Sequence, residues 1–65
     1  MVATLTQIAD CAAVSRRALL IGNIQADVMA KEAAHKFYCG LSVEGYSLLR
    51  NANRLVGYAI NPETL

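Results

Sequence analysis

The sequence contains no tryptophan, one phenylalanine, one proline and only two cysteines among its 65 residues. Two cysteines are too few for the disulfide framework that stabilises small secreted domains. The N-terminal run MVATLTQIAD lacks both the basic start and the apolar core of a signal peptide. These absences predict a protein that is not secreted by a signal peptide, and that resides in the cytoplasm or within an intracellularly assembled particle.

Long apolar runs are also missing. A membrane-spanning helix needs roughly eighteen or more consecutive apolar residues. Every candidate stretch is interrupted by charged or amide side chains, namely Asp10, Arg16, Arg17, Asn23, Asp27, Lys31 and Glu32. We therefore expect no membrane span.

Neither sign of charge dominates, because six Lys and Arg face five Asp and Glu, for a formal net charge of +1. A dedicated nucleic-acid binder of this size is more often distinctly basic. In contrast, hydrophobic residues make up 55% of the chain, and the mean hydropathy is +0.33. A domain of this length hides only roughly 60% of its unfolded surface. Apolar surface should therefore remain outside, as it does at protein interfaces.

The spacing of apolar residues predicts an all-α fold of two to three helices in a single domain, residues 1–65. The first helix is expected to begin at the N-cap Thr4 and to cover residues 4–13. A turn near residue 13 would follow, with Ser15 capping a long central helix that runs to about Cys39.

Gly40 is expected to end this central helix in a left-handed conformation, and Ser42 to cap an antiparallel C-terminal helix. The apolar face of that helix comprises Gly45, Leu48, Leu49, Ala52, Leu55, Val56 and Ala59. In the tail INPETL, Asn61 suits a cap and Pro62 suits a first helical position. The tail is expected either to dock on a neighbour or to form a simple end.

The central helix carries two apolar stripes and therefore needs two neighbours. One neighbour can be the rest of this chain and the other a partner, or a second copy of the same chain. The predicted interface residues are Leu19, Ile21, Gly22, Ile24, Ala26, Val28, Met29, Ala33 and Phe37.

The run TLTQIADCAAVSRRAL, residues 4–19, resembles the helix-turn-helix of the lactose-repressor family. The resemblance implies that Ser15 caps a recognition helix whose Arg16 and Arg17 reach the major groove of DNA. It also implies a small, dimeric DNA-binding regulator. The sequence departs from the family after residue 19, because Leu20 and Ile21 take positions that face DNA in those proteins.

Chemistry-bearing residues are few. His35 and Cys39 stand four apart on the predicted central helix, which is a spacing that can hold two zinc ligands, with Cys11 as a conceivable third. No fourth ligand is evident, so we expect no metal and no cofactor. The same Cys and His lack a third group to orient them as a nucleophile and base, so we expect no enzymatic activity. Arg50 and Arg54 form a local basic patch, which is either a solvated face or a contact for an acidic partner or phosphates.

The sequence thus predicts a non-enzymatic helical subunit that buries its surplus apolar surface against other protein chains or against itself. A minor structural or accessory component of a larger particle, such as a phage or virus particle, is one setting that fits. The alternative is the helix-turn-helix regulator that reads DNA through Arg16 and Arg17.

Overall fold

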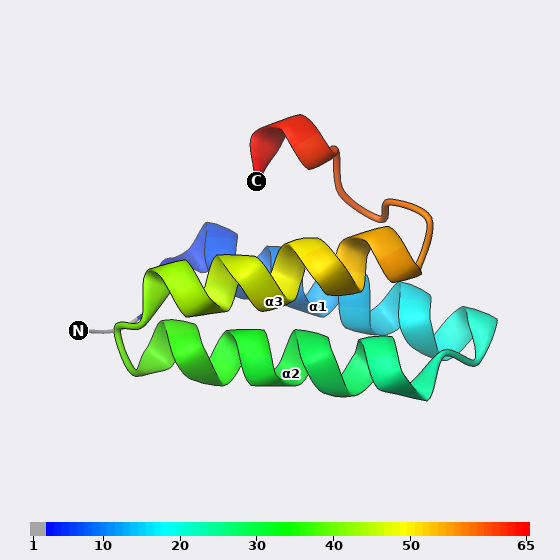
Figure 1. Cartoon of the computed structure of the whole chain (residues 1–65), viewed down its shortest axis with the longest axis horizontal. Coiled ribbons are helices and arrows are strands. Elements are labelled where there is room, and N and C mark those ends of the chain that lie inside the picture. Colours follow the sequence, from blue (N-terminus) through cyan, green and yellow to red (C-terminus); the bar gives the residue numbers. More distant parts are fainter. Residues whose placement is uncertain (1–2) are drawn as a thin grey trace.

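A computed structural model describes residues 3–65 and contains three α-helices and one short 3-10 helix. They are α1 (Leu5–Ile21), α2 (Ile24–Tyr38), α3 (Ser42–Leu55) and η1 (Pro62–Thr64). The described part of the chain contains no strand, so the predicted all-α fold class is confirmed. The molecule is elongated along its helices and measures 32 × 22 × 17 Å (Figure 1).

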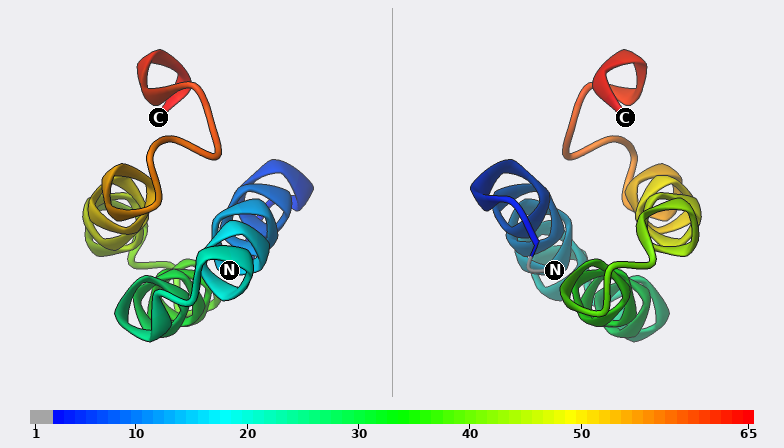
Figure 2. Two further views of the ribbon diagram at one scale, coloured as in Figure 1. Left: turned by 90° about the vertical axis from the view of Figure 1, so that its right-hand side faces the viewer. Right: turned by 90° about the vertical axis from the view of Figure 1, so that its left-hand side faces the viewer.

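The helix α2 lies between the other two. Both α1 and α3 pack along α2, whereas they barely contact each other. Seen along the helices, α1 and α3 diverge from α2, and the C-terminal tail lies above the opening between them (Figure 2). The α3 helix returns antiparallel to α2, as predicted, because only residues 39–41 connect them.

The N-terminal helix begins as predicted and ends later than predicted. Thr4 caps it through a reciprocal pair of hydrogen bonds with Gln7, in which each backbone N–H donates to the other side chain at 3.0 Å. The turn expected near residue 13 is wrong, because residues 13–15 lie in the middle of α1. Nothing in this stretch interrupts a helix, since it contains neither glycine nor proline.

The helix breaks at the Gly22-Asn23 step instead. Gly22 has a φ of +74°, which is a left-handed conformation that glycine adopts without a steric penalty. The Asn23 side chain then accepts a hydrogen bond from the Ala26 N–H at 3.0 Å and caps α2. The predicted helix from Ser15 to Cys39 is therefore two helices joined by a tight turn.

The connection between α2 and α3 follows the prediction in part. Gly40 is left-handed, with a φ of +78°, as expected of a residue that ends a helix. The helix α3 starts at Ser42, but Leu41 occupies the N-cap position and no side chain caps the helix. The predicted Ser42 cap is therefore wrong.

Small side chains dominate the core. The buried hydrophobic residues, each at most 4% exposed, are Cys11, Val14, Ala18, Ala26, Ala30, Ala33, Phe37, Leu49, Ala52 and Val56. The largest of them, Phe37, covers Gly45 of α3 so closely that a Cβ there would lie 2.6 Å from its ring. Phe37 also meets the edge of Tyr46 at a ring-centre distance of 4.8 Å. Alanine and glycine at these positions let the helix backbones approach closely and leave little interior volume for larger aliphatic residues.

The tail after α3 folds back onto that helix (Figure 1). The buried Asn53 amide donates to the carbonyl oxygen of Ile60 and accepts from its N–H, both at 2.9 Å. Arg50 donates from two guanidinium nitrogens to the Leu65 carbonyl oxygen, at 3.2 and 3.1 Å. Asn61 caps η1, as its sequence position predicts. Of the two expected arrangements, the tail docks, and its neighbour is its own chain.

Candidate protein interface

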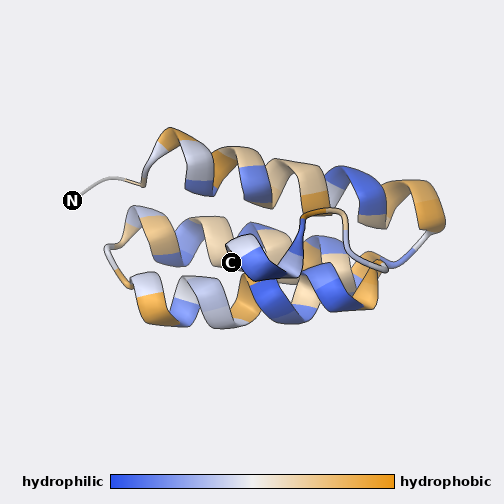
Figure 3. Cartoon of the chain, turned by 90° about the horizontal axis from the view of Figure 1, so that it is seen from above, coloured by the Kyte–Doolittle hydropathy of each residue, from blue (hydrophilic) through white to orange (hydrophobic). Residues whose placement is uncertain are grey.

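Large aliphatic side chains gather where α1 turns into α2. Five of them are between 47% and 79% exposed, and we call this set the apolar end: Leu19, Leu20, Ile21, Ile24 and Val28. Figure 3 shows the hydrophobic segment at the end of α1 that leads into α2. The C-terminal end of α3 lies at the same end of the bundle (Figure 1), and α3 ends at the exposed Leu55.

The apolar end carries no charge. The nine residues from Ala18 to Ala26 include no Asp, Glu, Lys or Arg, and charged residues return only at Arg17 and Asp27 on either side. The centres of protein interfaces are similarly depleted of charge, whereas their rims are polar. Fully removing one Leu or Ile side chain from water contributes about 1.5–3 kcal/mol. Burial of the apolar end against another protein would therefore contribute favourable hydrophobic free energy to binding.

The predicted interface residues divide into two groups. Leu19, Ile21, Gly22, Ile24 and Val28 are exposed, and Met29 is half-buried.

Three predicted interface residues, Ala26, Ala33 and Phe37, are buried inside the chain's own core, so their assignment to a partner is corrected. The physical reason is that α2 lies between α1 and α3. These two helices cover the face of α2 that the sequence analysis assigned to another chain. Leu20 was missing from the predicted set. In one continuous α1 it lies off the buried line of Cys11, Val14 and Ala18, and it is the most exposed member of the apolar end.

A buried carboxylate fastens α1 to α2 just beside the apolar end. Asp27, in the first turn of α2, accepts a hydrogen bond from the Ser15 hydroxyl of α1 and another from the Lys31 ammonium at 2.9 Å. These two bonds, the one from Ser15 first, lower the pKa of Asp27 below its ordinary value. Sequence reasoning missed this contact because Ser15 suits a helix cap equally well, and only the packing of α1 on α2 brings it to Asp27.

The residues predicted for DNA contact, residues 15–17, lie in the C-terminal half of α1. Arg16 and Arg17 are exposed, and the Arg17 Nε donates to the Val56 carbonyl oxygen at 3.4 Å. Ser15 is half-buried and bonded to Asp27. The three residues therefore belong to one uninterrupted helix, with no turn before Ser15.

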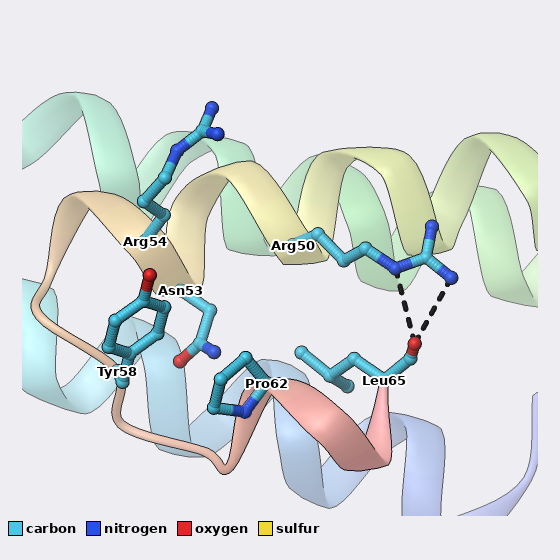
Figure 4. Close-up of a pocket in the computed structure, with 6 residues that line it drawn as sticks. All are labelled: Arg50, Asn53, Arg54, Tyr58, Pro62 and Leu65. Atoms are coloured by element: carbon cyan, nitrogen blue, oxygen red, sulfur yellow. Dashed lines mark hydrogen bonds between the residues drawn. The ribbon is translucent and has the colours of Figure 1, made fainter.

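A pocket of about 170 Å³ lies between α3 and the tail, and Figure 4 shows the six residues that line it: Arg50, Asn53, Arg54, Tyr58, Pro62 and Leu65. Its polar groups do not converge on a common point. Arg50 is bonded to Leu65, and Arg54 extends away from the tail and donates to the Asn51 side chain at 3.0 Å. Ligand pockets are usually larger, roughly 300–1,000 Å³, and present convergent polar groups. This pocket is therefore smaller than a usual ligand site, and the Arg50 and Arg54 side chains that line it are bonded within the chain.

The conceivable zinc ligands are only partly brought together. Cys39 Sγ and His35 Nε2 lie 3.7 Å apart, and both residues are exposed. Cys11 is buried on α1, where burial and the nearby Asp10 raise the pKa of its thiol to about 11, which disfavours the thiolate that a metal requires. Among residues 3–65, no group of three or more His, Cys, Asp or Glu side chains is assembled that could hold a metal ion.

Over residues 3–65, none of the helices combines the length and the apolar character needed to cross a bilayer. Comparisons with protein-family models, with curated proteins and with solved structures found no match to this chain.

Proposed function

We propose that this chain is a non-enzymatic helical subunit that packs into a larger protein assembly through its apolar end. One observation carries the proposal: alanines fill the core, while the large aliphatic residues of the apolar end remain in water. Folding alone leaves this surface uncovered, and a protein partner would cover it. A small subunit of this kind would fit a structural or accessory role in a larger particle.

The shape of the apolar end supports docking of another protein element. Gly22 stands at its tip, and no other part of the chain lies within 4 Å of the position where a Cβ would project. A partner can therefore approach the backbone of the turn closely, with Leu20 and Ile24 on either side of it. The hydrogen bond from Ser15 on α1 to Asp27 on α2 joins the two helices behind this turn, so the surface is held in place before a partner binds.

The test compares the wild type, one double variant and one control variant by sedimentation of the tagged protein from its native source and by native mass measurement after purification. The double variant Leu20→Ser with Ile24→Ser removes the centre of the apolar end. The matched control is Leu5→Ser, which makes the same chemical change at an exposed leucine on the opposite end of α1. The wild type and the control should sediment with a heavy particle or as an oligomer, and the double variant as a free chain. A wild type that is solitary in both measurements would refute the proposal.

The alternative function is DNA binding, and the observation that favours it is the exposure of Arg16 and Arg17. A regulator would bind duplex DNA with an affinity that falls steeply with salt, by a log–log slope of about −0.9 for each phosphate contact. Arg16→Ala with Arg17→Ala would flatten that slope. A gel-shift titration at two salt concentrations therefore separates this alternative from the assembly subunit, for which no DNA binding is expected.

A further inference from the structure

The last turn of α2 holds a pair of metal-binding side chains in a ready geometry. The atoms Cys39 Sγ and His35 Nε2 are 3.7 Å apart on the exposed side of the helix. In a tetrahedral zinc site, with Zn–S of about 2.3 Å and Zn–N of about 2.0–2.1 Å, sulfur and nitrogen ligands are separated by about 3.5–3.6 Å. The separation of these two atoms is therefore close to that of two ligands on one zinc ion.

The charges around the pair also suit a cation. Cys39 is the C-cap of α2 and therefore lies at the negative end of the helix dipole. The neighbouring cation, Lys36, has its ammonium group 3.9 Å from the Glu44 carboxylate on α3, which compensates its charge. The two lysines nearest the pair along α2, Lys31 and Lys36, both face carboxylates, those of Asp27 and Glu44.

The pair supplies only half of a structural zinc site, which takes four protein ligands. Within residues 3–65, this chain offers no third ligand to the pair. The exposed apolar residues Tyr38, Leu41 and Val43 lie within four residues of Cys39, so they leave apolar surface beside it that a second protein would cover.

We propose that two copies of this chain bind one soft divalent cation of the zinc type between the C-terminal ends of their α2 helices. Each copy provides His35 Nε2 and Cys39 Sγ, which gives a tetrahedral set of two nitrogens and two sulfurs. Each Cys39 thiol releases its proton to solvent as its sulfur binds the metal, and no oxidation takes place.

This site is separate from the apolar end. The turn between α2 and α3 and the turn between α1 and α2 lie at opposite ends of the bundle (Figure 1). The metal-bridged pair consequently does not depend on the assembly contact proposed above, and a chain that lacks the apolar end should still form it.

The test is titration of the full chain with Co²⁺, in the presence of a phosphine reductant and a metal-free buffer, followed by absorption spectroscopy and native mass measurement. We expect one metal per two chains, a dimer that appears with the metal, and the intense spectrum of tetrahedral cobalt with thiolate ligands. Zn²⁺ should displace Co²⁺ and keep the dimer. His35→Gln and Cys39→Ser should each abolish both the spectrum and the dimer.

Two controls isolate the proposed ligands. Cys11→Ala removes the buried thiol and should leave binding unchanged, and Leu20→Ser with Ile24→Ser should leave the metal-dependent dimer intact. The proposal is overturned by binding of one metal per chain, by a spectrum that survives His35→Gln, or by the absence of binding. It is equally overturned by a dimer that chelation leaves intact and reduction dissociates, because that dimer would be a Cys39 disulfide.

Discussion

The two faces of α2 are packed in different ways. Toward α3, the contact is made by large apolar side chains, with Phe37 seated over Gly45 and against the edge of Tyr46. Toward α1, the core side chains are short, and a buried polar contact between Ser15 and Asp27 adds to them.

The difference explains why several large aliphatic side chains remain exposed at the turn between α1 and α2. The α2–α3 pair uses its large residues internally, so its middle offers few of them to solvent. The α1–α2 pair is held by alanines and a polar contact, and its large aliphatics, including Leu20 and Ile24, point outward. Two helices that pack through small residues can therefore remain associated while their larger residues stay available to contact a partner.

The largest expected effect comes from removing the main side chain of the α2–α3 contact. Phe37→Ala should lower the free energy of unfolding by about 3–5 kcal/mol, because it loses buried area and leaves a cavity. The matched control, Leu19→Ala, removes a large but mostly exposed side chain on α1 and should change stability by about 0.5 kcal/mol or less. Urea denaturation followed by circular dichroism measures both. Equal losses would show that Phe37 contributes no more to stability than an exposed side chain, which would contradict its place in the α2–α3 contact.

A smaller effect is expected from adding a side chain at Gly45, where α3 lies against the Phe37 ring. The added methyl group of Gly45→Ala would lie 2.6 Å from the Phe37 ring, and such overpacking costs about 1–3 kcal/mol. The higher helix propensity of alanine offsets roughly 0.5–1 kcal/mol of this cost. A net loss of stability should therefore appear in thermal unfolding. Ser47→Ala, at an exposed position of the same helix, is the control and should not destabilise the protein. A more stable Gly45→Ala variant would mean that Phe37 is not held tightly.

The smallest effect concerns the polar contact on the α1 side, and it depends on pH. Because folding lowers the pKa of Asp27 from an ordinary value of 3.8, its contribution is present above that value and is lost as pH falls through the lower folded pKa. Asp27→Asn should therefore be less stable than the wild type at neutral pH, with a difference that shrinks in acid. Glu32→Gln, which removes one exposed negative charge from the same helix, controls for net charge. Thermal unfolding at several pH values provides the measurement, and a difference that grows in acid would contradict the prediction.

Several elements could be read from the sequence because their causes are local. Thr4, Gly40, and Asn61 with Pro62 each form a cap or a stop within a few residues, so their neighbours in sequence suffice to predict them. The break at Gly22 was also local, and the adjacent Asn23 was its signal. It was missed because a single glycine is tolerated within a helix, at a cost of about 1 kcal/mol.

By itself the sequence determined the helical class of this protein, the starts of α1 and α3, the end of α2 and the excess of apolar residues. Hydrogen bonds between residues three or four apart, and the average hydropathy of the chain, do not depend on how the helices are arranged. Only the tertiary structure decided which apolar residues fill the core and which remain outside, since that depends on α2 lying between α1 and α3. It also decided that Ser15 meets Asp27 and that Asn53 holds Ile60, because those partners come together only when separate segments pack.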